Sequence, residues 1–230
     1  MGRPGTVVWV VGRYRGKNLG GAGEGHDGSG MMFDPCPVRL EGNHVRLEPL
    51  TLAHASGLFS AAVPEVFRFL IIRPFESAAD AERYVAEALA AQAAGHEVAY
   101  ATVRRSDGKV VGSTRYIDIR RPHRGLEIGW TWITPEAQRT AVNTEAKYLM
   151  LRQAFEGWGA LRVQLKTDEN NTQSRAAILR LGAVYEGILR KQMLRPYDGY
   201  ERDTAMFSII ESEWPAVKAG LEAKLARGAP

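Results

Sequence analysis

The stretch LEIGWTWITPEAQRTAVNTEAKYLMLRQAFE, residues 126–156, carries the strongest structural signal in the chain. Residues 125–133 alternate as a β-strand does, which predicts Glu127, Gly129 and Thr131 on one face. The predicted opposite face carries Ile128, Trp130 and Trp132.

A helix is predicted directly after this strand, with Thr140 or Asn143 available as its N-cap. Its buried face is formed by residues spaced three and four apart: Ala146, Leu149, Met150, Gln153, Ala154 and Trp158. A turn from a strand into a helix often holds an anion, because the first N–H groups of a helix lack internal partners. This turn, QRTAVNTEA at 138–146, contains no glycine.

The rest of the chain from residue 35 onward predicts one α/β (α+β) domain over 35–230. The expected strands are 44–50, 97–105, 110–119, 161–168, 184–194 and 202–210. An Asp-Gly pair within 106–109 predicts a hairpin between two of them. The expected helices are 51–62, 77–91, 172–181 (ended by Gly182) and 214–225. Along the chain, mainly antiparallel strands come first, and a crossover helix, a strand and another helix follow them.

Composition limits the possible functions. The chain has 230 residues, with 30 Lys and Arg against 26 Asp and Glu, and this net charge of +4 disfavours a nucleic-acid partner. One cysteine, Cys36, and five scattered histidines predict no metal site. Residues 1–34 are glycine-rich and are expected to be a flexible tail. No membrane association is expected, because no apolar run is long enough to span a bilayer, and a cytoplasmic location is expected.

A second motif, VQLKTDENNTQSRAAILRLGAVYEG at 163–187, follows the first in order. Together they resemble the GNAT superfamily of N-acetyltransferases, in particular the branch of ribosomal-protein N-terminal acetyltransferases. The resemblance covers roughly residues 39–225. It implies a GNAT fold, which is a mostly antiparallel mixed sheet flanked by helices, with splayed central strands forming an acyl-CoA cleft.

The resemblance also implies a coenzyme A site with acetyl-CoA as cosubstrate. Residues expected at the cofactor are Ile133, Gln138, Arg139, Thr140, Ala141, Val142, Asn143, Thr144, Asn171 and Ser174. The family turn carries small residues, usually glycine, where Arg139, Ala141 and Asn143 stand, but helix N–H groups and the helix dipole need no glycine to hold phosphate. Alternatively, Arg139 faces solvent and Asn143 only caps the helix. Asn171 and Ser174 also have plain roles in a turn and a helix start. Lys147, Arg175 and Arg180 are candidates for the 3′-phosphate or are simply solvated charges.

For catalysis, an acceptor amine must lose a proton, since its pKa lies between about 8 and about 10.4. Glu127 resembles the family glutamate that acts as base, directly or through water. Alternatively, Glu127 faces solvent or forms an ion pair with Arg115 or Arg124. Ser174 is the candidate donor to the departing thiolate, with Tyr185 in reserve, and a backbone N–H near Ile133 polarises the thioester carbonyl.

The acceptor is the least constrained part of the prediction. The resemblance places Trp130, Trp132, Arg115, Phe69 and Tyr197 at the acceptor, although alternating aromatics in a strand are often core. A peptide N-terminus and a small-molecule amine remain equal alternatives. Two other classes are an acyl-CoA-sensing module without turnover, and an interaction domain that dimerises through its C-terminal helix.

Overall fold

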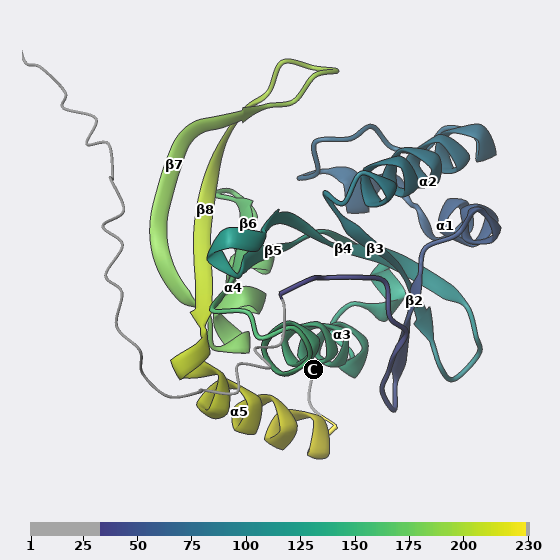
Figure 1. Cartoon of the computed structure of the whole chain (residues 1–230). Helices are drawn as coiled ribbons and strands as arrows, with labels where there is room; N and C mark the ends of the chain where they lie inside the picture. Colours follow the sequence, from purple (N-terminus) through teal and green to yellow (C-terminus); the bar gives the residue numbers. More distant parts are fainter. Residues whose placement is uncertain (1–32, 229–230) are drawn as a thin grey trace, which may run out of the picture. The chain divides into compact units, whose positions relative to one another are not determined.

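The computed structural model describes residues 33–228, which form one eight-stranded sheet flanked by helices (Figure 1). The strand order is β1-β2-β3-β4-β5-β6-β8-β7, and every neighbouring pair is antiparallel except β5 and β6. The strands are β1 (Leu40–Glu41), β2 (Val45–Pro49), β3 (Val98–Arg104), β4 (Val110–Arg120), β5 (Gly125–Ile133), β6 (Arg162–Asp168), β7 (Val184–Leu194) and β8 (Glu201–Ile210). The predicted mixed α/β class is therefore confirmed.

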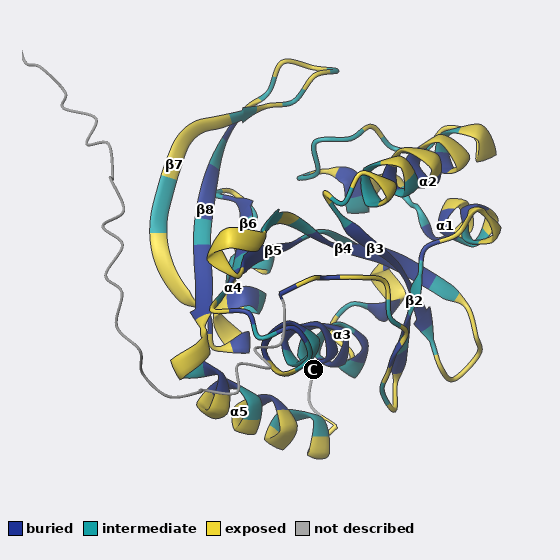
Figure 2. Ribbon diagram, in the orientation of Figure 1, coloured by how far each residue is buried: buried dark blue, intermediate teal, exposed yellow. Residues whose placement is uncertain are grey.

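Helices cover both faces of the sheet. The longer ones are α1 (Ala55–Ala61), α2 (Ala78–Ala93), α3 (Ala141–Arg152), α4 (Thr172–Leu181) and α5 (Trp214–Ala226). Short helical turns are η1 (Leu52–His54), η2 (Pro64–Phe67), η3 (Arg121–His123), η4 (Pro135–Ala137), η5 (Gln153–Gly157, of π type) and η6 (Glu211–Glu213). One apolar core joins the sheet to α3, α4 and α5, and a second joins the other face to α1 and α2. In Figure 2, β8 is buried along most of its length, whereas β7 at the sheet edge is largely exposed.

Local sequence explains where the helices begin and end. Asp80 accepts a hydrogen bond from the Ser77 backbone N–H at 2.8 Å, as predicted for the start of α2. Gly182 ends α4 with φ +100°, a left-handed conformation that glycine adopts without steric cost. Thr140, one of the two predicted caps, is the N-cap of α3.

The predicted alternation of β5 is wrong beyond Gly129, because the strand contains a bulge. Arg115 of β4 pairs with Gly129 and Ser113 pairs with Trp132, so two residues of β5 oppose one of β4. Trp130 has φ +51°. The extra residue reverses the faces, and Trp132 therefore lies on the α1–α2 side together with Glu127.

The parallel pairing of β5 and β6 stops early. Only three residue pairs join the strands, and the last is Glu127 with Gln164. Residues 129–133 of β5 and 165–168 of β6 have no such pairing with each other, and we call this region the β5–β6 fork. The splayed central strands that the family resemblance implies are present here.

The packed part of the chain begins before residue 35. Phe33 is 6% exposed and lies in the larger core, and Asp34 pairs with Arg121 at 3.3 Å. The remainder of the predicted tail, 1–32, lies outside the described residues. Within residues 33–228, no helix combines the length and apolarity that crossing a bilayer requires.

Candidate active site

The turn between β5 and α3 is held by its own side chains. Gln138 Nε2 donates to the carbonyl oxygen of Ile133 at 3.2 Å. Thr140 Oγ1 donates to the carbonyl oxygen of Ala137 at 2.7 Å and accepts from the N–H of Val142 at 3.3 Å. Arg139 has φ +56°, the left-handed region that favours glycine. The chain therefore makes a glycine-type turn with an arginine, whose side chain is exposed.

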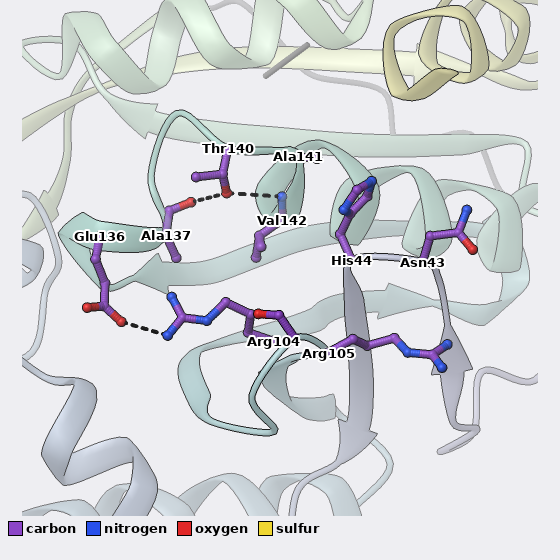
Figure 3. A pocket seen from close by; sticks show the side chains of 10 residues that line it. Asn43, His44, Arg104, Arg105, Glu136, Ala137, Thr140, Ala141 and Val142 are labelled. Atoms are coloured by element: carbon purple, nitrogen blue, oxygen red, sulfur yellow. Dashed lines mark hydrogen bonds and ion pairs between the residues drawn. The ribbon is translucent and has the colours of Figure 1, made fainter. Parts of the chain in front are cut away.

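The first turn of α3 opens onto a pocket of about 440 Å³, drawn in Figure 3. Its lining includes Thr140, Ala141 and Val142 from the predicted anion turn. Its two arginines already have partners, because Arg104 bonds Asp107 and Glu136 while Arg105 donates to the Gly42 carbonyl. No lining residue comes from β6 or α4, so this pocket lies apart from the β5–β6 fork.

The start of α4 faces the same turn. Asn171 caps α4 by accepting from the Ser174 N–H at 3.0 Å, which agrees with its predicted turn role. Gln173 Nε2 donates to Gln138 Oε1 at 3.0 Å and so connects the start of α4 to the β5–α3 turn. Ser174 is half-buried, and its hydroxyl is not used in the cap.

Glu127 lies where the β5–β6 fork begins. It is 1% exposed, so the solvent-facing interpretation is wrong. Oε2 accepts from Gln164 Nε2 at 2.7 Å and lies 3.2 Å from Lys166 Nζ, while Oε1 has no partner. The anticipated ion pair with Arg115 or Arg124 is also wrong, because Lys166 takes that place. A buried carboxylate with one free oxygen is suited to accept a proton.

Arg115 is buried between two aromatic rings. Its guanidinium carbon lies 4.5 Å from the ring centroids of both Tyr84 and Trp130, and its Nη1 donates to Glu97 at 2.8 Å. Trp130 is half-buried, whereas Trp132 is 3% exposed and packs on Phe67. Trp132 therefore belongs to the core, as the alternative interpretation held, and Trp130 is the indole nearer a surface.

The loops that carry Phe69 and Tyr197 meet on the α1–α2 side. Arg195 Nη1 donates to the carbonyl oxygen of Arg68 at 2.8 Å, which ties the β7–β8 hairpin to the loop before α2. The Arg73 guanidinium lies 5.5 Å from the ring centroid of Tyr197. In Figure 1, the tip of the β7–β8 hairpin extends toward the α2 side of the sheet.

Lys147 is buried, so its interpretation as a solvated charge is wrong. It is 6% exposed, and its Nζ lies 2.5 Å from Thr131 Oγ1 and 3.3 Å from Thr114 Oγ1. Burial lowers the pKa of its ammonium group to about 7. Arg175 bonds the carbonyl oxygen of Glu169. Arg180, at the end of α4, is exposed and remains a candidate.

A further polar cluster on the face of Glu127 was not predicted. Asp168, Arg202 and Thr204 are all buried there. Sequence gives little sign of it, since these residues meet only because β6 pairs with β8, which is not its neighbour in the chain. In the described residues, no cluster of three or more His, Cys, Asp or Glu side chains is arranged to hold a metal ion.

Comparisons with known proteins match this geometry. The acetyltransferase (GNAT) domain family matches residues 44–184, so the chain belongs to the GNAT family and is an acetyltransferase. The uncharacterised N-acetyltransferase YoaA of Bacillus subtilis is 25% identical over 173 residues, which cover 75% of this chain and 96% of YoaA. The candidate ribosomal N-acetyltransferase YdaF of the same organism is 29% identical over 112 residues, or 49% of this chain and 60% of YdaF.

Solved structures give the same result. A GCN5-related N-acetyltransferase from Brucella melitensis is 32% identical, covers 84% of this chain and 87% of its own, and superimposes with a TM-score of 0.78. Membership of the family implies acyl transfer from acetyl-CoA. The name of YdaF refers to the ribosomal branch of the family that the sequence motifs resemble.

Proposed function

We propose that this protein is an N-acetyltransferase that moves the acetyl group of acetyl-CoA to a primary amine by direct attack on the thioester. The observation that carries the proposal is the position of Glu127. Its free Oε1 is buried at the point where β5 and β6 separate, on the strand that leads into the cofactor turn. An amine placed in the fork can therefore meet a base and a thioester together.

The residues at the turn fit the cosubstrate. The first N–H groups of α3 point out of the helix start, and the positive end of the helix dipole favours a pyrophosphate there. Arg139, exposed beside them, adds a positive charge. The unpaired edge of β5 toward the fork leaves backbone groups for the pantetheine amides. When bound, acetyl-CoA supplies the activated acetyl group.

The chain's own groups handle the protons. Glu127 accepts a proton from the acceptor ammonium, and the neutral nitrogen then forms a bond to the acetyl carbon as the carbon–sulfur bond breaks. The nitrogen then passes its second proton to the departing thiolate, either through water or through the Ser174 hydroxyl, which donates its own proton to sulfur and regains one from the nitrogen. Glu127 releases the first proton to solvent. The β5 edge at Ile133 supplies the N–H that polarises the carbonyl.

A calorimetric titration with acetyl-CoA, followed by a thiol-release assay on amines and peptide N-termini, tests this function. Micromolar binding together with amine-dependent thiol release is the expected result. Binding without thiol release for any amine would instead indicate the acyl-CoA-sensing module. No binding up to millimolar acetyl-CoA would contradict both.

A further inference from the structure

Three buried polar side chains outside the proposed reaction lie on the Glu127 face of the sheet. Asp168 of β6 is 1% exposed, Thr204 of β8 is 0% exposed and sits directly opposite Asp168, and Arg202 is 8% exposed. Each has an unpartnered polar atom that is shielded from solvent: Asp168 Oδ2, Thr204 Oγ1 and Arg202 Nε. Buried groups of this kind are rarely left unpaired, so three together point to a ligand.

Arg202 is the costliest of the three to bury. Within the described residues it forms no ion pair, and its Nε–H lacks an acceptor. Burial lowers the pKa of its guanidinium group, and the nearby charges of Asp168 and Glu127 only oppose that shift. A guanidinium in this position gains most from a ligand oxygen that accepts its Nε–H.

The charges of the cluster indicate which ligand fits. Lys166 already balances Glu127 through their 3.2 Å contact. That leaves one negative and one positive side chain, Asp168 and Arg202, which do not pair with each other. A neutral group with an accepting oxygen and a donating N–H complements them, whereas a polyamine or a phosphate complements only one.

One oxygen of Asp168 is already fixed, which leaves the other free for a ligand. Oδ1 accepts from the Asn170 backbone N–H at 2.8 Å and lies 3.3 Å from the Tyr200 hydroxyl. Tyr200 belongs to the turn after β7, whose Arg195 bonds the Arg68 carbonyl. The turn therefore contacts the cluster through Tyr200, and it also carries Tyr197, a residue predicted at the acceptor.

We propose that Asp168, Arg202 and Thr204 form a subsite that reads an amide group of the acceptor. The amide N–H donates to Asp168 Oδ2, and the amide oxygen accepts from Arg202 Nε–H, with Thr204 Oγ1 alongside. This inference rests on the proposed acetyltransferase function. The subsite selects acceptors that carry an amide near the reactive amine over plain amines.

The test compares matched acceptors on the full chain with saturating acetyl-CoA. The probes are amino-acid amides, the corresponding amino-acid methyl esters and the corresponding alkylamines, with release of free thiol as the readout. Wild-type protein is expected to favour the amide over the ester and the alkylamine by roughly tenfold to a hundredfold in kcat/KM. Dipeptides in the same assay distinguish a peptide amide from a terminal carboxamide.

Asp168→Asn gives the decisive variant. Its side-chain amide can donate to an ester oxygen but accepts the amide N–H less well, so the amide-to-ester preference should fall toward one or invert. Damage to the fold alone would lower both rates together and leave their ratio unchanged. Asp203→Asn is the control, since Asp203 accepts from the Lys191 N–H instead and should keep the wild-type ratio. Thr204→Val, which keeps the side-chain shape, should reduce the preference by a smaller factor.

The outcomes separate the subsite from the reaction. Equal rates for amides, esters and alkylamines in the wild type would overturn the subsite and leave the acetyltransferase function standing. Absence of thiol release with every acceptor would overturn the function and the subsite together. An Asp168→Asn variant with an unchanged preference would also overturn the assignment.

Discussion

Gln173 Nε2 donates to Gln138 Oε1 at 3.0 Å, and this bond joins the start of α4 to the turn that precedes α3. The same Gln138 is anchored to the end of β5 through the carbonyl oxygen of Ile133. Around the β5–β6 fork, the Gln138 side chain therefore connects the end of β5, the turn before α3 and the start of α4. Gln173 itself is exposed, so the bond is made at the surface.

Removing this bond should weaken cofactor binding with little effect on stability. In Gln173→Ala the turn loses an exposed partner, and we expect the Kd for acetyl-CoA to rise about twofold to tenfold, the value of one neutral hydrogen bond. Calorimetric titration measures the change. Leu179→Ala, at an exposed position of the same helix, controls for loss of a side chain from α4. An unchanged Kd in Gln173→Ala would mean that the turn is ordered without Gln173.

A pair of substitutions at Arg139 separates backbone conformation from charge. Arg139→Gly and Arg139→Ala remove the same positive charge, but only glycine adopts φ +56° without steric cost. The glycine variant should therefore be more stable than the alanine variant by about 1 kcal/mol. Urea unfolding measures this difference. Equal stabilities would show that the turn relaxes out of the left-handed region.

Both variants should lose acetyl-CoA affinity equally if Arg139 acts only through charge. A weaker Kd for alanine than for glycine would indicate that the backbone conformation itself presents the N–H groups. No loss in either variant would mean that the exposed Arg139 side chain makes no contact with the cofactor, which is the alternative that the sequence left open.

Amphipathic patterns and short capping motifs predicted most elements of the fold. The Ser77–Asp80 pair and Gly182 fixed helix ends because they act within a few residues of the chain. The bulge at Trp130 was missed, since a tryptophan at φ +51° has no local signature and depends on β4 packing beside it.

In the candidate site, too, local patterns were predicted and contacts between distant parts of the chain were missed. The motif and the strand order predicted Glu127 and the turn at 138–140 as site residues, whereas the ion-pair partner of Glu127 was not predicted. Lys166 and Arg202 were missed because contacts between residues far apart in the chain determine their surroundings. Lys147 was predicted either to contact the 3′-phosphate or to be a solvated charge, yet it lies buried against Thr131.

Lys147 should make stability depend on pH. Its pKa is about 7 in the folded protein and 10.5 as the ordinary value. Below pH 7 both states hold the proton and the penalty for burying the charge is fully present. Between pH 7 and 10.5 only the unfolded state holds it, so the free energy of unfolding rises with pH, by at most about 1.4 kcal/mol per unit.

Lys147→Met tests this dependence, because methionine fills similar space without titrating. Urea unfolding of both proteins at pH 7, 8 and 9 should show the wild type gaining stability relative to the variant as pH rises. Parallel curves would mean that Lys147 stays charged in the fold. Glu82→Gln, on the exposed side of α2, controls for a general change in net charge.

Glu127→Gln should lower turnover mainly below about pH 8, where acceptor amines are protonated and need a base. We expect a loss of roughly a hundredfold there, narrowing as pH rises and free amine becomes available. The affinity for acetyl-CoA should remain almost unchanged, because Glu127 contacts Gln164 and Lys166 and lies outside the cofactor turn. Thiol-release rates from pH 6 to 10, with calorimetry in parallel, measure both effects.

A pH–rate profile with the wild-type shape would remove Glu127 from proton transfer. A parallel loss of acetyl-CoA affinity would instead show that its contacts with β6 hold the β5–β6 fork open for the cofactor.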